Sequence, residues 1–194
     1  MQSDERWLVA GLGNPGPRFR RTRHNAGFLL VDRLAARYGA TFRRRGLRYR
    51  VAEIELAGRP VVLVKPLWFI NLSGRPVAAA LRAYGIPVER LVVAQDDLDF
   101  PFGVVRLKRG GGPAGHKGAH SVNAALGTRR YLRLRLGIGR PPKGGSTGDF
   151  VLGEFTAAEQ EQLPALLDRC ADGLGELVAR GPDRAQQRLH TATS

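Results

Sequence analysis

Four polar residues, widely separated in the chain, are of the types that hydrolyse an ester with water alone. His24 lies in the segment TRHNAG, Asp96 follows the apolar run LVVAQ, and Asn14 and Asn71 lie in GLGNPG and FINLSG. An imidazole can take a proton from water near neutral pH, and a carboxylate on its other nitrogen fixes its tautomer. Side-chain amides or backbone N–H groups can bind the carbonyl and its developing oxyanion. Together these residues predict hydrolysis by activated water.

Each of these residues also has an ordinary structural interpretation when it is taken alone. His24 can cap a helix or lie on the surface, and Asn71 can satisfy backbone groups in a loop. Asp96 can form a turn with the acidic residues that follow it. The interpretation as an active site therefore depends on the four side chains lying together in the fold.

The segments that would hold these residues alternate between strand and helix patterns. An apolar run at 7–13 predicts a buried strand with a glycine turn, and 26–39 has apolar residues at helical spacing. Further strands are expected as a pair within 48–66, at 91–95, within 104–109 and within 132–139. Three further helices are expected: one that begins after Ser73, a short one that ends at about Gly127, and one from about Thr156 to Ala179.

This alternation indicates one α/β domain over residues 1–194, with a twisted, mixed and largely parallel sheet flanked by helices. We expect its core to span residues 7–180 and the tail at 181–194 to be loosely ordered. The polar residues of interest would then lie in loops that follow strands or precede helices. Open α/β sheets usually place their sites there.

The chain carries a large excess of positive charge. It has 31 basic and 17 acidic side chains, a net charge of +14, and its basic residues concentrate in 1–50 and 101–150. The strands within 104–109 and 132–139 alternate apolar with basic residues, so each is expected to turn a basic face outward. This pattern favours a polyanionic partner, although an arginine-rich genome and an ordinary solvated surface would give a similar composition.

Composition argues against several other kinds of protein. The single cysteine, Cys170, has no disulfide partner in the chain, and the four histidines show no zinc-type spacing. The apolar runs are too short to cross a bilayer, so we expect a cytoplasmic protein that does not bind to a membrane. We also expect no metal and no cofactor. Ser73 and Ser121 lack a nucleophile-elbow sequence, and Cys170 falls inside a predicted helix.

The turn Gly11-Leu-Gly-Asn-Pro-Gly16 matches the dinucleotide-binding pattern GxGxxG after a strand. That site needs a helix to begin within the turn, whereas Pro15 and Pro17 extend the loop here. The acidic residue expected after the second strand is also missing, because the next strand carries Arg48 and Arg50. The sequence therefore argues against a nicotinamide cofactor, and a glycine turn without a ligand remains an alternative.

A combination of five segments resembles the bacterial-type peptidyl-tRNA hydrolase family. These segments are GLGNPGPRFRRTRHNAG at 11–27, KPLWFINLSG at 65–74, VVAQDDLDFPFG at 92–103, LKRGGGPAGHKG at 107–118 and RLRLGIGRP at 133–141. They occur in the family's order and spacing, over residues 7–180. The resemblance implies an enzyme that works without metal or organic cofactor, generally as a monomer, and releases tRNA from peptidyl-tRNA.

The resemblance also implies a role for each matching residue. His24 would be the base, Asp96 would stabilise its basic form, Asn14 would distinguish peptidyl from free aminoacyl groups, and Asn71 would hold substrate and water. The residues implied to contact the tRNA are Phe19 and Phe69 at its 3′ end, and Lys108 and Arg135 on its phosphates.

The chain departs from the family pattern most clearly at Lys117. Many members have an asparagine in that loop, and a lysine cannot both donate and accept hydrogen bonds, so we assign Lys117 to substrate binding and not to catalysis. This change keeps open an alternative, a non-catalytic RNA-binding module on the same fold. Retention of His24 with Asp96 favours the enzyme, since a binding module needs no base.

Overall fold

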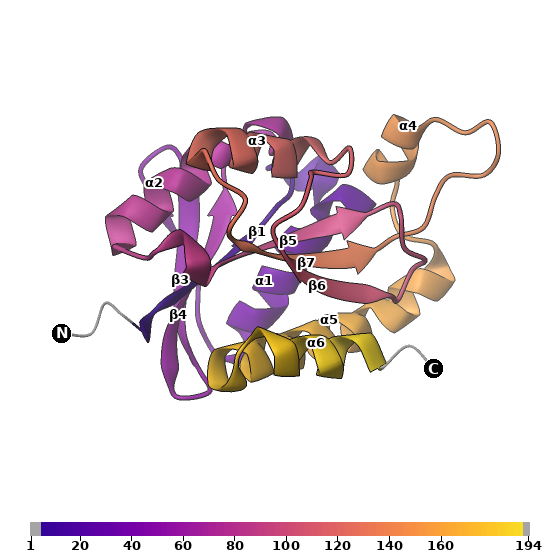
Figure 1. Cartoon of the computed structure of the whole chain (residues 1–194). Coiled ribbons are helices and arrows are strands. Elements are labelled where there is room, and N and C mark those ends of the chain that lie inside the picture. Colours follow the sequence, from indigo (N-terminus) through magenta and orange to yellow (C-terminus); the bar gives the residue numbers. More distant parts are fainter. Residues whose placement is uncertain (1–4, 192–194) are drawn as a thin grey trace.

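A mixed β-sheet forms the centre of the computed structural model, which describes residues 5–191 (Figure 1). Its seven strands run in the order β2-β3-β4-β1-β5-β7-β6. They are β1 (Trp7–Gly11), β2 (Arg43–Arg45), β3 (Tyr49–Leu56), β4 (Arg59–Pro66), β5 (Leu91–Asp97), β6 (Val105–Arg109) and β7 (Leu132–Gly137). The four inner strands from β4 to β7 pair in parallel, and β2, β3 and β6 pair antiparallel at the two sides.

The central residues of β1, β4 and β5 are apolar because helices cover both faces of the sheet there. The strand β5 is buried along its whole length. The expected mixed α/β sheet flanked by helices is confirmed, with parallel pairing confined to the inner strands. No helix in the described part of the chain is long and apolar enough to cross a membrane.

One face of the sheet packs against α1 (Ala26–Arg37) and α5 (Ala157–Arg180). Thr156 begins α5 with a capping box, in which its side chain accepts from the Glu159 N–H and the Glu159 carboxylate accepts from the Thr156 N–H. The start of α1 lies very close to β5. A Cβ at Gly27 would fall 2.3 Å from the Ala94 carbonyl oxygen, so only glycine fits there.

The opposite face packs against α2 (Gly74–Tyr84) and α3 (Lys117–Leu126), which form a second apolar layer with β1 and β4. Both helices end at a left-handed glycine, Gly85 and Gly127. The expected cap at Ser73 is wrong in detail. Ser73 occupies the N-cap position, but its hydroxyl donates to the Ile70 carbonyl oxygen and caps no helical N–H.

The tail expected at 181–194 to be loosely ordered instead forms α6 (Pro182–Thr191) across its described part. Ala185 and Leu189, one helical turn apart, are fully buried, and Leu189 lies directly over Gly173 of α5. His190 Nε2 accepts a hydrogen bond from the backbone N–H of Leu107 in β6. The two apolar residues are too few to predict a helix from sequence, but they suffice to dock one.

The expected outward basic face is also wrong for part of β7. Arg133 of β7 is buried because the glycine-rich loop lies over its side chain, and its guanidinium donates to the carbonyl oxygens of Gly110 and Gly112. Burial lowers the pKa of Arg133 from its usual value, and the nearby Arg135 adds to this effect. Arg133 therefore holds the glycine-rich loop in place and is not available to a partner.

Candidate active site

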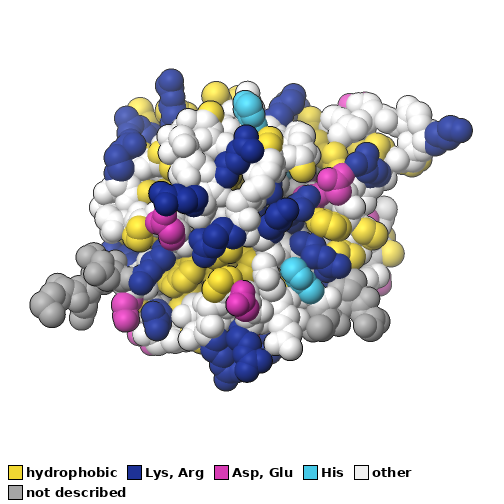
Figure 2. All heavy atoms as spheres, viewed as in Figure 1, with side chains coloured by type: hydrophobic (Ala, Val, Ile, Leu, Met, Phe, Trp, Pro, Cys, Tyr) yellow, Lys and Arg dark blue, Asp and Glu magenta, His cyan; other side chains and the backbone are white. Residues whose placement is uncertain are grey.

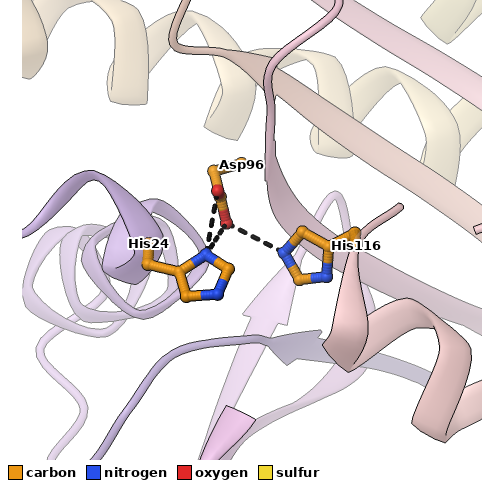
Figure 3. Close-up of side chains that lie close together, drawn as sticks. All are labelled: His24, Asp96 and His116. Carbon is orange, nitrogen blue, oxygen red and sulfur yellow. Dashed lines mark hydrogen bonds and ion pairs between the residues drawn. The ribbon is translucent and has the colours of Figure 1, made fainter. Parts of the chain in front are cut away.

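His24 and Asp96, 72 positions apart in the chain, meet at the carboxyl end of the sheet. His24 lies in the short helix η3 (Arg23–Asn25) before α1, and Asp96 is the penultimate residue of β5. The His24 Nδ1 lies 3.0 Å from Oδ1 and 2.9 Å from Oδ2 of Asp96 (Figure 3). Since an ionised carboxylate only accepts, Nδ1 carries the proton and Nε2 of His24 is left as a base.

A second histidine binds the same carboxylate. His116 Nε2 lies 2.9 Å from Asp96 Oδ1, while its Nδ1 accepts the N–H of Ala119 as the N-cap of α3 (Figure 3). Because Nδ1 is an acceptor, the proton of neutral His116 must lie on Nε2, where it is donated to Asp96. Asp96 thus receives hydrogen bonds from two imidazoles.

These contacts determine the charge of Asp96, which is 2% exposed. Burial by itself raises the pKa of this carboxyl, but charge interactions and hydrogen bonds with His116 and His24 outweigh burial and hold its pKa well below the usual range. The carboxylate is therefore ionised at neutral pH. It can stabilise an imidazolium on His24.

The neighbours of His24 in η3 fix its position. Arg23 is buried, and its guanidinium donates to the Glu154 carbonyl oxygen and the Glu159 carboxylate while lying 4.3 Å from the Phe150 ring centroid. Asn25 is also buried and binds both backbone groups of Asn14, accepting from its N–H at 2.8 Å and donating to its carbonyl oxygen at 3.0 Å.

The side chain of Asn14 is oriented by a further hydrogen bond. Its Oδ1 accepts from the Ile70 N–H at 2.8 Å, so its amide nitrogen is the group left to donate. Asn14 lines the same cavity as His24 and Asp96. The site therefore offers a hydrogen-bond donor, and not an acceptor, beside the proposed base.

The cavity has a volume of about 770 Å³ and an aromatic rim. Phe19 and Phe69 meet edge to face with ring centroids 6.3 Å apart, and Phe69 is 57% exposed. Asn71, in the short helix η4 (Ile70–Leu72), and Lys117 at the start of α3 also line it. Such a rim suits a ligand with a flat ring and an anionic or polar end.

Two predicted contacts lie outside this cavity lining. Lys108 is exposed on β6, and Figure 2 shows many other basic side chains and few acidic ones on that face of the molecule. Arg135 on β7 is mostly buried, with Nε 2.5 Å from Asp97 Oδ2 and a longer contact to Asp99. Its charge is thus largely compensated within the chain.

The glycine turn after β1 packs against α1. A Cβ at Gly11 would lie 2.2 Å from the Gly27 carbonyl oxygen, and one at Gly13 would meet the Phe28 ring at 2.6 Å. Both glycines are therefore required for contact between the turn and the helix. Packing against α1 therefore explains the glycine-rich pattern without a dinucleotide whose pyrophosphate contacts the turn.

The chemistry of the histidine pair also bears on metal binding. One ligand atom each of His24, Asp96 and His116 lie within 4.8 Å of one another, which is close enough for a metal site. However, each imidazole nitrogen that faces Asp96 is engaged with the carboxylate at hydrogen-bond distance, and the tautomer of His116 places a proton there. The arrangement fits a hydrogen-bonded triad.

Comparison with known proteins gives one consistent result. A sequence model of the family described as peptidyl-tRNA hydrolase matches residues 8–194. The chain belongs to the peptidyl-tRNA hydrolase family. The peptidyl-tRNA hydrolase of Frankia casuarinae is 55% identical over 187 residues, covering 96% of this chain and 95% of that protein, and the one of Frankia alni is 51% identical over the same shares.

A crystal structure of the peptidyl-tRNA hydrolase of Acinetobacter baumannii has the same fold. It superimposes with a TM-score of 0.88 at 33% identity and covers 98% of this chain and 96% of that one. The resemblance inferred from the five segments is thereby confirmed over the full length. The roles of the individual site residues remain predictions.

Two residues that hold the site of this peptidyl-tRNA hydrolase are not predicted from its sequence. His116 was assigned no role, although a histidine directly before a helix in a glycine-rich loop could have suggested a cap. Asn25 follows His24 directly and was also assigned no role, because nothing in its spacing points to Asn14. Cys170 lies inside α5, as the sequence predicts, and is buried in the core, and burial raises the pKa of its thiol to about 12.

Proposed function

We propose that this protein hydrolyses the ester bond between a peptide and the 3′ end of tRNA, releasing both products. The observation that carries the proposal is the hydrogen bond between His24 Nδ1 and Asp96 at the wall of a cavity that also contains Asn14 and Asn71. The relatives that bear this activity in their names match the chain along nearly its whole length.

The reaction begins when His24 Nε2 takes a proton from water and the resulting hydroxide attacks the ester carbonyl carbon. The carbonyl π electrons move to oxygen, and the oxyanion is stabilised by the amide N–H groups of Asn14 or Asn71. Asp96 stabilises the imidazolium formed on His24. The intermediate then re-forms its carbonyl, expels the ribose oxygen, and His24 returns the proton to it.

Selection of peptidyl over free aminoacyl substrates follows from the orientation of Asn14. Its amide nitrogen donates, so it suits the carbonyl oxygen of an acylated amino group. A free α-ammonium presents only donors and is not matched by this group. Asn14 therefore protects ordinary aminoacyl-tRNA in this proposal.

The tRNA would be held by the rim and by basic side chains. Phe19 and Phe69 stack on the bases of the 3′ end, and Lys117 meets its phosphate or ribose, supported by their place in the cavity lining. Lys108 attracts phosphates of the tRNA further from its 3′ end. Arg135 contributes less to this attraction, because Asp97 compensates much of its charge. We propose that the chain works as a cytoplasmic monomer, without metal or cofactor.

The test is turnover of an N-acetylated aminoacyl-tRNA by the wild type and by His24→Ala. We expect release of free tRNA by the wild type and a loss of at least about a hundredfold in kcat for the variant. The exposed His120 on α3 supplies the matched control, His120→Ala, which should retain activity. Equal tRNA binding without turnover by any of the three proteins would instead favour the RNA-binding module.

A further inference from the structure

A hairpin at one side of the sheet carries more positive charge than the fold explains. The antiparallel pair β2 and β3 and the turn between them contain five arginines within eight residues, which are all exposed: Arg43, Arg44, Arg45, Arg48 and Arg50. No acidic residue occurs between Asp32 and Glu53. Within residues 5–191, none of the five guanidiniums pairs with a carboxylate.

The strand register places like charges directly opposite one another. Arg44 in β2 faces Arg50 in β3, and Arg50 faces Lys65 in β4, so three cations stand side by side on one face of the sheet. Directly opposite like charges destabilise a sheet. Lys65 is compensated by both carboxylate oxygens of Asp32 at 2.7 Å, but Arg44 and Arg50 are not compensated.

The hairpin is joined directly to the wall of the active-site cavity. The N–H of Leu67, just after β4, donates to the Arg48 carbonyl oxygen at 2.8 Å. Leu67 precedes the cavity residue Phe69 by two positions, a chain distance of at most about 7 Å. The hairpin is therefore attached to the segment that leads into the aromatic rim, and Figure 1 shows β3 and β4 as neighbouring strands.

Protection of an edge strand does not account for all of these charges. Charged residues on β2 would discourage pairing with another chain, since β2 is the outermost strand. However, Arg50 lies on β3, which pairs with a strand on each side, and Arg48 lies in the turn. An anion bound across the hairpin would relieve the repulsion between Arg44 and Arg50.

We infer that the arginine hairpin, residues 43–50, binds the sugar-phosphate backbone of the tRNA whose 3′ end enters the cavity. Guanidinium groups suit phosphate because they donate two parallel hydrogen bonds. Arg44 and Arg50, opposite each other on neighbouring strands, form the centre of this surface. The inference rests on the proposed function, because it takes the macromolecule at the cavity to be tRNA.

The test compares two substrates that share the ester but differ in the length of RNA. These are N-acetyl-aminoacyl-tRNA and the same N-acetyl-aminoacyl group on a CCA trinucleotide. For Arg44→Ala/Arg50→Ala we expect KM for the full tRNA to rise about tenfold with kcat unchanged, and kcat/KM for the trinucleotide ester to stay the same. The slope of log KM against log salt should become smaller by about two, one unit for each lost phosphate contact.

Two further variants test whether KM depends on the charge of this hairpin or on any loss of surface charge. Arg44→Lys/Arg50→Lys keeps both charges, so it should keep the wild-type salt slope but recover only part of the affinity for tRNA, because lysine cannot donate two parallel hydrogen bonds. Arg180→Ala/Arg184→Ala removes two exposed charges from α5 and α6 and should leave KM unchanged. Gly175, near the end of α5, lies by Leu56 at the end of β3 away from the hairpin turn. The Tm of Arg44→Ala/Arg50→Ala should be at or above the wild-type value, since like-charge repulsion is removed.

An unchanged KM for the full tRNA in Arg44→Ala/Arg50→Ala would overturn the inference. An equal rise of KM for both substrates would overturn it too, because the hairpin would then act through the cavity. If the wild type cleaves neither ester, the proposed hydrolysis fails, and binding of uncharged tRNA by wild type and variant decides the hairpin separately. Weaker binding by the variant supports it, and equal binding refutes it.

Discussion

The Nε2 atom of His116 lies 2.9 Å from Oδ1 of Asp96, and the same oxygen lies 3.0 Å from Nδ1 of His24. Two imidazoles from opposite sides of the site thus share one carboxylate. The acceptor role of His116 Nδ1 toward Ala119 makes this second imidazole a donor to Asp96 in its neutral form. His116 is therefore placed to hold Asp96 for His24.

Replacing His116 should weaken catalysis more than binding. In His116→Ala, Asp96 stays buried but loses one donor, so the pKa of its carboxyl rises and the carboxylate is held less firmly against His24. We expect kcat to fall about ten- to a hundredfold with little change in KM, the range typical of a lost support for a catalytic group. His116→Gln retains an N–H donor and should recover part of the rate. An unchanged kcat in His116→Ala, or a change in KM as large as the change in kcat, would contradict this role.

The buried Asp96 should also make stability depend on pH. Its pKa is lower in the folded chain than the unfolded value of about 3.9, so its ionisation favours folding above about pH 4. This contribution decreases as pH falls below about 4 and is lost once the folded pKa is passed. Urea unfolding between pH 7 and pH 3 should show wild type and Asp96→Asn converging at the acid end. Asp99→Asn, at a more exposed position, should run parallel to the wild type.

Substitution of Asn14 should mainly reduce the selectivity of the protein for N-acylated substrates. Asn14→Asp replaces the amide donor by an acceptor, which repels the carbonyl oxygen of an N-acylated substrate and attracts a free ammonium. We expect the ratio of kcat/KM for N-acetylated over free aminoacyl-tRNA to fall at least about tenfold, with Asn14→Ala in between. Initial rates on the two substrates measure this ratio. If both variants keep the wild-type ratio, Asn14 does not discriminate.

The terminal helix α6 should contribute measurably to stability. Leu189 is fully buried against α5, so Leu189→Ala should lower the free energy of unfolding by about 2–5 kcal/mol. Arg184→Ala on the exposed side of the same helix is the control and should change it by less than about 0.5 kcal/mol. Equal unfolding curves for Leu189→Ala and the wild type would mean that α6 is not docked in solution.

The sequence predicts the longer strands and helices in their order, because their apolar patterns are long and are bounded by glycine and proline, but it does not predict β2 or the short helix at Thr147–Leu152. It also predicted that His24 and Asp96 belong together, since each follows or precedes a clear element and lies in a family segment. It failed where a residue's environment depends on distant neighbours. The alternation of β7 predicts an exposed Arg133, but the glycine-rich loop folds over its side chain and buries it.

His116 escaped prediction for a related reason. Its partner Asp96 is 20 positions away and reaches it only after α3 has packed over β5. The helix α6 was missed because only Ala185 and Leu189 mark its buried side, and its other described residues are polar or charged. In both cases the information lies in the tertiary contact and not in the local pattern.

The way α6 meets the sheet has a consequence for how the molecule behaves in a crowded cell. The outer side of β6 would otherwise present free backbone groups to the β-strands of other chains. At Leu107 both groups are already occupied: His190 accepts from its N–H, and the Gln186 side chain donates to its carbonyl oxygen. Loss of the last ten or so residues would unmask this border, and the shortened protein would be prone to aggregate through intermolecular strand pairing.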